Sequence, residues 1–125
     1  LLVRRACWEQ VGLLDESIVM YGEEVDWCYR MQQRDWQVIH CHEASVIHYG
    51  GQSSIGAPTR KYVQLQQGRV TFFRKHRGRL ATPILILAIR LSSLLKAGFC
   101  TVRHGGASHA LEMREAYLAA TRSQF

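Results

Sequence analysis

Apolar residues recur at the spacing of an amphipathic helix in two internal stretches, and we predict a helix over 23–34 and another over 59–76. The first stretch begins with acidic residues and ends with arginines, the order that the helix dipole favours. Gly68 lies inside the second stretch, where a glycine costs about 1 kcal/mol relative to alanine. A short helical turn over 6–11 and a final helix after residue 103 complete the predicted helices.

Three short stretches rich in β-branched or aromatic residues predict strands, at 1–5 (LLVRR), 36–40 (WQVIH) and 44–48 (ASVIH). The segment YGGQSSIGAP, at 49–58, is a predicted loop because of its glycines, serines and proline. Short strands that alternate with helices are typical of an α/β domain. We therefore expect the α/β fold class.

The stretch at 82–99, TPILILAIRLSSLLKAGF, is the most hydrophobic in the chain. It contains Arg90 and Lys96, and its length matches only the shortest membrane spans, since a transmembrane helix needs roughly 20 apolar residues. A helix that lies on a membrane surface or packs on the domain is favoured over a true span.

With 125 residues, 47% of them hydrophobic, the chain can bury one modest core, which indicates a single domain or part of one. It begins with a hydrophobic dipeptide in place of an initiator methionine, so we expect a fragment. Residues 1–50 carry four Arg/Lys against eight Asp/Glu, a net charge of −4, and residues 51–125 carry twelve against two, a net charge of +10. This asymmetry indicates a site that uses carboxylates, next to a surface that meets an anionic partner: phospholipid, a nucleotide diphosphate or nucleic acid. Nucleic acid is the weakest of the three, because no reader motif or aromatic platform accompanies the basic residues.

Cysteine and histidine spacing argues against a structural zinc site or a disulfide framework. The cysteines have no C-x-x-C spacing, and reduced thiols in the cytosol are the simplest interpretation. His40 and His42 share a face of an extended segment, but no further ligand is spaced to complete a tetrahedral site. The four cysteines are Cys7, Cys28, Cys41 and Cys100.

The segment YGEEVDWCYR, at 21–30, places Glu23, Glu24 and Asp26 within four positions. One interpretation is a solvated helix start after Gly22, because acidic side chains are stabilised by the positive end of the helix dipole. The other is a site that needs negative charge. The two interpretations are compatible, since a helix N-terminus can hold carboxylates rigidly.

Several motifs occur in the order found in one enzyme family: RR…GLLDE, YGEEVDWCYR, the Trp36 strand, ASVIHYGGQSS and FFRKHRG. Over roughly residues 1–79 the chain resembles the C-terminal half of the catalytic domain of family 2 glycosyltransferases, especially rhamnosyltransferase-like members. The resemblance implies the C-terminal, acceptor-side part of a GT-A fold at 1–79, followed by additional helices in a basic tail at 80–125. The chain differs from the family at Asp35, where glycine is common, and at His42, where proline is common.

The resemblance implies inverting transfer of a sugar, rhamnose among the candidates, from a nucleotide-diphosphate donor. The family's general base maps onto Glu24, at a position where Asp is more frequent, and Glu23 and Asp26 are second candidates. A base must come within about 2.6–3.2 Å of the atom whose proton it takes, so geometry decides between them.

The resemblance further implies substrate-binding roles for Trp27, Arg69, Lys75 and His76, and a contribution of His48 to a divalent metal, Mg²⁺ or Mn²⁺. The metal-binding D-x-D motif of the family does not occur in this chain. Expected partners are a nucleotide-diphosphate sugar, a cell-envelope glycan or lipid-linked acceptor and the membrane surface, at the cytoplasmic face of the plasma membrane. The alternative is a truncated, non-catalytic module that binds an acceptor or docks on a membrane.

Overall fold

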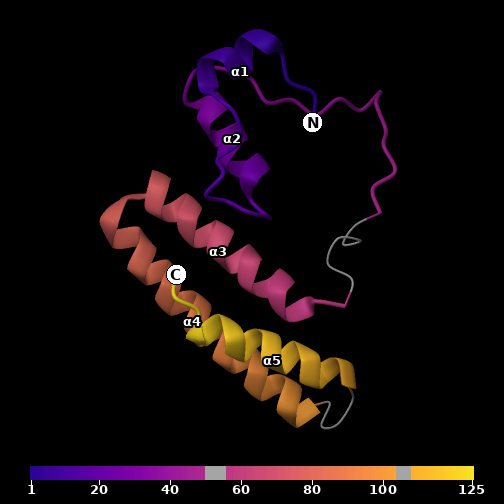
Figure 1. The fold of residues 1–125 in the computed structure, drawn as a ribbon, viewed down its shortest axis with the longest axis vertical. Coiled ribbons are helices and arrows are strands. Elements are labelled where there is room, and N and C mark those ends of the chain that lie inside the picture. Colours follow the sequence, from indigo (N-terminus) through magenta and orange to yellow (C-terminus); the bar gives the residue numbers. More distant parts are fainter. Residues whose placement is uncertain (50–55, 104–107) are drawn as a thin grey trace.

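The computed structural model describes residues 1–49, 56–103 and 108–125, and all regular secondary structure in these ranges is helical. Helices α3, α4 and α5 lie side by side as a three-helix bundle, in which α4 runs antiparallel to α3 and to α5 (Figure 1). Helices α1 and α2 form a smaller unit beside α3 (Figure 1). The five helices are α1 (Arg5–Val11), α2 (Glu23–Gln32), α3 (Pro58–His76), α4 (Gly78–Arg103) and α5 (Ser108–Arg122).

A small apolar core holds α1 against α2. Cys7 and Val11 of α1 are buried against Met31 of α2. Val3, Trp27 and Trp36 pack around these three side chains and cover them. The indole N–H of Trp36 also donates to Gln10 Oε1 at 2.9 Å, which ties the end of α2 back to α1.

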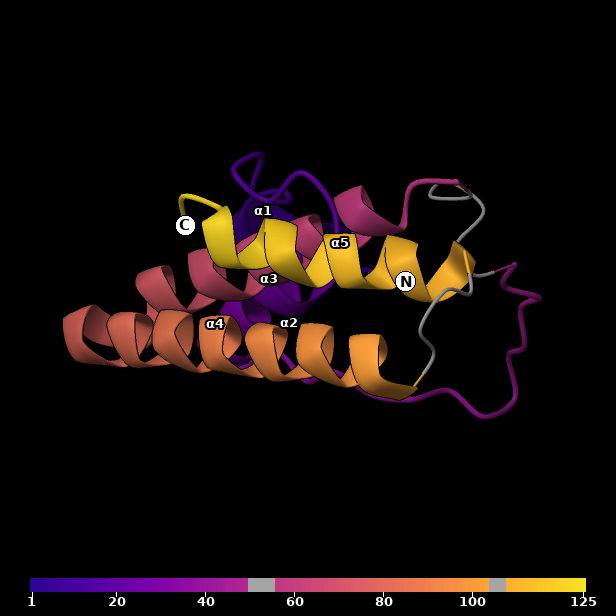
Figure 2. The ribbon, with the colours of Figure 1, turned by 90° about the horizontal axis from the view of Figure 1, so that it is seen from below.

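The bundle has a second, separate core in which small side chains dominate. Val70 of α3 and Ile89 of α4 are its larger buried members. The remaining apolar ones are alanines, which let α4 and α5 approach closely over most of their length (Figure 2): Ala97, Ala116 and Ala120. Ser93 is fully buried in α4, and its hydroxyl is 3.1 Å from the Tyr62 hydroxyl of α3.

The end of α2 is closed by a residue in the left-handed conformation. Asp35 has φ +61°, and the N–H of Trp36 donates to the Met31 carbonyl at 3.1 Å. This pattern is a helix C-cap in which glycine is usual, because glycine adopts positive φ without steric cost. Asp35 therefore adopts a conformation that glycine would adopt at lower steric cost.

The four longer predicted helices are confirmed, with α4 beginning four residues before the predicted apolar stretch. The predicted α/β fold, and with it the GT-A architecture, is wrong for the part of the chain described: segments 1–5, 36–40 and 44–48 form no strand. A strand is stable only when a neighbouring strand pairs with its N–H and C=O groups. Residues 36–49 instead run extended away from the helices (Figure 1), with Ile39, Val46 and Ile47 each at least 80% exposed. Residues 50–55 of the predicted loop lie outside the described ranges.

Candidate functional site

The loop that leads into α2 touches α3 at Gly68. A Cβ atom at this position would lie 2.1 Å from the Tyr21 carbonyl oxygen, a distance that no pair of non-bonded atoms tolerates. Tyr21 and Gly22 both have positive φ, +69° and +111°, which turns the chain sharply before the first acidic residue of α2. Gly68 is therefore the point at which the start of α2 rests on the bundle.

A second contact, two turns further along α3, is made by Asp26, whose side chain is completely buried. Oδ1 of Asp26 lies 2.6 Å from His76 Nε2 and 2.9 Å from Lys75 Nζ. Oδ2 accepts from Arg30 Nε at 2.8 Å and from Lys75 Nζ at 3.0 Å. Both oxygens are thus saturated, and a carboxylate in this state holds α2 on α3 across 49 and 50 residues of sequence.

The partners of Asp26 are themselves anchored on the N-terminal unit. Arg30 donates to the carbonyls of Val11 at 2.8 Å and Leu13 at 2.6 Å, so it also fixes the end of α1. Lys75 reaches Asp15 Oδ2 at 2.5 Å. We call the five charged or titratable residues the Asp26 cluster: Asp15, Asp26, Arg30, Lys75 and His76.

Aromatic rings enclose the His76 side of the cluster. The His76 imidazole lies 4.5 Å from the Tyr29 ring and 4.8 Å from the Phe72 ring, between centroids. Tyr29 and Phe72 meet edge to face at 5.3 Å. The guanidinium of Arg77 covers the Tyr29 ring at 5.6 Å. The His76 side chain is 11% exposed in this surrounding, and its Nε2 faces Asp26 Oδ1.

The electrostatics favour the charged forms of both acids and of the lysine. Burial acts to raise the pKa of Asp26, but hydrogen bonds from His76, Lys75 and Arg30 outweigh it, and the pKa is lowered. The pKa of Asp15 is held far below its usual range, first by Lys75 and then by Ser17. Burial acts to lower the pKa of Lys75, yet Asp15 and Asp26 together raise it.

The two glutamates at the start of α2 are placed differently from Asp26. Glu24 is exposed, and within the described residues its side chain makes no ion pair or hydrogen bond. Glu23 is half-buried, and its enclosed Oε2 has no hydrogen-bond partner among the described residues. An enclosed acceptor of this kind costs free energy until a donor reaches it. Of the three acids, Glu24 and Glu23 are therefore the ones with oxygens left to accept a proton.

The other predicted site residues lie apart. The half-buried Trp27 packs in the N-terminal core and donates from Nε1 to the Gly12 carbonyl at 2.8 Å. Arg69 is exposed on α3 and donates to Gln66 at 3.3 Å. Lys75 and His76 belong to the Asp26 cluster. His48 is exposed in the extended segment, away from the acidic turn.

In the ranges 1–49, 56–103 and 108–125, no group of three or more His, Cys, Asp or Glu side chains is arranged to hold the expected divalent metal. Asp26 is unsuited as a ligand, because cations already occupy both of its oxygens.

Sequence reasoning missed Arg30 and Asp15 as members of the cluster. Arg30 lies four residues after Asp26, a spacing at which helical side chains pair, and this signal was available. Asp15 pairs with Lys75 across 60 residues, for which the sequence contains no local signal.

Curated proteins with similar sequences are glycosyltransferases. The chain is 33% identical over 48 residues to the low-salt glycan biosynthesis hexosyltransferase Agl10 of Haloferax volcanii, a match that covers 38% of this chain. It is 39% identical over 54 residues to the N-acetylglucosaminyl-diphospho-decaprenol L-rhamnosyltransferase of Mycobacterium tuberculosis, covering 43% of this chain. The chain spans less than a fifth of the length of either relative, 16% and 18%. No protein-family model and no solved structure matches the chain.

Proposed function

We propose that this chain contributes the proton-accepting carboxylate of an inverting glycosyltransferase, with Glu24 as the general base. The observation that supports this role is the contrast within the acidic turn. Asp26 and Gly68 fix the turn on the bundle, while Glu24 remains open to a substrate. A carboxylate on a rigid helix start is held in place before the substrate arrives, which lowers the cost of reaching the reactive geometry.

In the proposed step, Glu24 accepts the proton of an acceptor hydroxyl as that oxygen forms a bond to C1 of the donor sugar. The bond between C1 and the diphosphate oxygen breaks at the same time, and the nucleoside diphosphate leaves with the electron pair. Attack from the side opposite the leaving group inverts the configuration at C1. Glu23 precedes Glu24 on the same turn of α2, and its half-buried carboxylate is a second candidate for the base.

The substrate classes follow from the relatives. The names of both relatives specify hexosyl or L-rhamnosyl transfer, and one names a diphospho-decaprenol acceptor. We propose a nucleotide-diphosphate hexose or deoxyhexose as donor and a glycan or lipid-linked sugar as acceptor, at the cytoplasmic face of the membrane. Arg69, exposed on α3, is proposed to contact the substrate, whereas Lys75 and His76 act through Asp26.

The test compares Glu24→Gln with the wild type in the full-length gene product. Transfer from a panel of nucleotide-diphosphate sugars to a polyprenyl-diphosphate N-acetylglucosamine acceptor is measured together with donor binding. We expect a loss of at least about 100-fold in kcat with donor binding unchanged, because general base catalysis contributes roughly 10²–10⁴-fold. The control is Glu16→Gln, an exposed acid outside the turn, which should keep full activity. Full activity in Glu24→Gln would exclude Glu24 as the base.

A second candidate function is a non-catalytic module that binds an acceptor or docks on a membrane. It is favoured by the missing metal-ligand set in the described ranges and by the exposed apolar surface of α4. Calorimetry of the 125-residue chain with nucleotide-diphosphate sugars and Mn²⁺ separates the two. Measurable donor binding by this chain contradicts the module.

A further inference from the structure

Helix α4 exposes a continuous row of large aliphatic side chains. The six residues recur at intervals of three, four or one, which places them on one side of a helix, and each is between 51% and 82% exposed. Six side chains of this size expose more than the few hundred Å² that an ordinary monomer leaves as one apolar patch. We call this row the α4 apolar face: Leu80, Ile84, Leu87, Leu91, Leu94 and Leu95.

The opposite side of α4 is already occupied by the bundle. Thr82, Ile89 and Ser93 are buried there. The ammonium of Lys96 lies 5.7 Å from the Tyr62 ring of α3 and 5.8 Å from the Tyr117 ring of α5. Figure 2 shows α4 at one edge of the bundle, with no helix of the described chain beyond it. The α4 apolar face is therefore turned outward along the length of the helix.

The charges on α4 itself are all positive. Helix α4 contains no Asp or Glu, and Arg79 and Arg90 are exposed along one flank of the apolar row. An apolar strip with basic residues on its border is complementary to a bilayer surface that carries anionic phospholipid. We propose that α4 docks on such a surface, with its apolar face at the level of the acyl chains and Arg79 and Arg90 at the headgroups.

The packing of α4 determines how it lies in the membrane. By length and composition the helix could cross a bilayer, and only 17% of its most apolar window is buried. Crossing would either strip α4 from the bundle, which uncovers the buried Ser93, or carry the exposed Arg69 and Arg74 of α3 into hydrocarbon. Both are costly. The helix therefore lies in the plane of the interface, where α3 and α5 stay in water.

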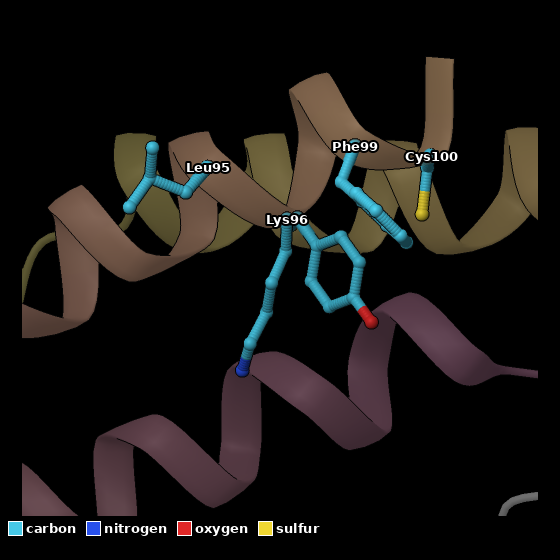
Figure 3. A pocket seen from close by; sticks show the side chains of 5 residues that line it. Leu95, Lys96, Phe99 and Cys100 are labelled. Atoms are coloured by element: carbon cyan, nitrogen blue, oxygen red, sulfur yellow. The ribbon is translucent and has the colours of Figure 1, made fainter. Parts of the chain in front are cut away.

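A hollow of about 420 Å³ opens at one end of the α4 apolar face, lined by residues of α4 and α5 (Figure 3). Leu95 belongs both to the lining of the hollow and to the α4 apolar face. Figure 3 shows the Lys96 side chain extending from α4 toward α3. Its lining is mostly apolar, with one ammonium. This composition suits the upper part of an acyl chain beneath an anionic headgroup.

A second copy of the chain is a poorer occupant of the same face. Arg90 lies at the middle of α4, so an antiparallel pair of α4 helices would bring two Arg90 side chains together. No acid on α4 is available to neutralise them. The membrane proposal stands on this surface alone and does not depend on the transferase function.

The test is flotation of the chain with phosphatidylcholine vesicles that contain or lack phosphatidylglycerol. We expect binding that requires phosphatidylglycerol, weakens with salt, and falls by about tenfold or more in Leu87→Glu/Leu91→Glu, because each substitution places a charge at the acyl level. The matched control is Leu13→Glu/Leu14→Glu, which adds the same charge at exposed leucines of the N-terminal unit and should bind as the wild type. Circular dichroism establishes that both variants keep their helices.

Three outcomes would overturn the proposal. They are absence of vesicle binding by the wild type, unchanged binding of Leu87→Glu/Leu91→Glu, and a dimer that this variant disperses without any vesicle binding. A second pair of variants, Arg79→Cys and Thr101→Cys, tests the orientation with a membrane-impermeant maleimide read by peptide mass. Labelling of both ends from outside supports the in-plane position, and labelling of one end alone shows a span.

Discussion

Replacement of Asp26 by asparagine removes the charge on which Arg30, Lys75 and His76 converge. The side chain of Asp26 is 0% exposed, and those of Arg30 and His76 are 16% and 11% exposed, so little water is available to replace it. Asparagine keeps one acceptor oxygen, but its NH₂ group faces N–H donors. Removing one partner of a buried ion pair costs about 3–5 kcal/mol, against a total stability of about 5–15 kcal/mol for a typical domain.

The chain contains a built-in probe for this loss. All three tryptophans, Trp8, Trp27 and Trp36, lie in the N-terminal unit, whereas most helical residues lie in α3, α4 and α5. In a urea titration, tryptophan fluorescence therefore reports the N-terminal unit, and circular dichroism at 222 nm reports mainly the bundle. We expect Asp26→Asn to move the fluorescence midpoint to lower urea by more than it moves the circular dichroism midpoint.

The contribution of the pair itself is measured with a double-mutant cycle. Asp26→Asn, Lys75→Met and the double variant should give a coupling energy of about 1–3 kcal/mol, because the two side chains are in direct contact. Glu16→Gln, an exposed acid outside the cluster, is the control and should change stability by less than about 0.5 kcal/mol. Coincident midpoints with a change of less than about 0.5 kcal/mol in Asp26→Asn would refute the anchoring role.

Three further predictions concern the same contacts. Gly68→Ala should destabilise the chain by about 1–3 kcal/mol in urea titrations, because its Cβ would overlap the Tyr21 carbonyl. Gly98→Ala is the control: a Cβ there meets no described atom of another segment within 4 Å, so it should stabilise the chain by about 0.5–1 kcal/mol. Equal effects of the two substitutions would contradict the close approach at Gly68. Asp35→Gly should raise stability by about 0.5–1 kcal/mol, as glycine removes the cost of φ +61°, and a loss of stability would show that the Asp35 side chain makes a compensating contact. The pKa values of Asp15 and Asp26 are lowered, so the stabilisation from these carboxylates is complete above the unfolded value of about 4 and is lost as pH falls through the folded values. In an acid titration, tryptophan fluorescence should therefore detect release of the N-terminal unit before circular dichroism detects melting of the bundle. Simultaneous loss of the fluorescence and circular dichroism signals would argue against this order.

The raised pKa of Lys75 gives stability the opposite dependence on pH. Its stabilisation is complete below the unfolded lysine value of about 10.4 and is lost only as pH rises through the higher folded value. The contributions of Asp15, Asp26 and Lys75 are therefore complete together between about pH 4 and about pH 10.

The helices were accessible to sequence reasoning because their signal is local. The apolar spacing in 23–34 and 59–76 and the charges at the ends of each stretch lie within a few turns of one another. The absence of strands was not accessible to sequence reasoning. The propensity of WQVIH and ASVIH for an extended conformation does not reveal whether another segment pairs with them. The predicted strands at 36–40 and 44–48 are wrong, because no segment of the described residues pairs with either of them.

The candidate site divides in the same way. Sequence alone placed three acids on one helix start and grouped two basic residues, Lys75 and His76, in a motif far along the chain. It could not distinguish Asp26 from Glu24, since carboxylates two residues apart look alike until one is buried. Gly68 shows the same limit: in the sequence it is a weak point of a helix, and in the structure it is where a carbonyl of another segment comes close.

By itself, then, the sequence determined the helices, the acidic turn and the relationship to glycosyltransferases, all of which depend on residues near one another in the chain. Only the tertiary structure decided that Asp26 is an anchor, that Glu24 is open, and that the aliphatic row of α4 faces outward. The physical reason is that burial and ion pairing depend on which distant segments meet. The Asp26 contacts to Lys75 and His76 join residues 49 and 50 positions apart, a distance that no local pattern spans.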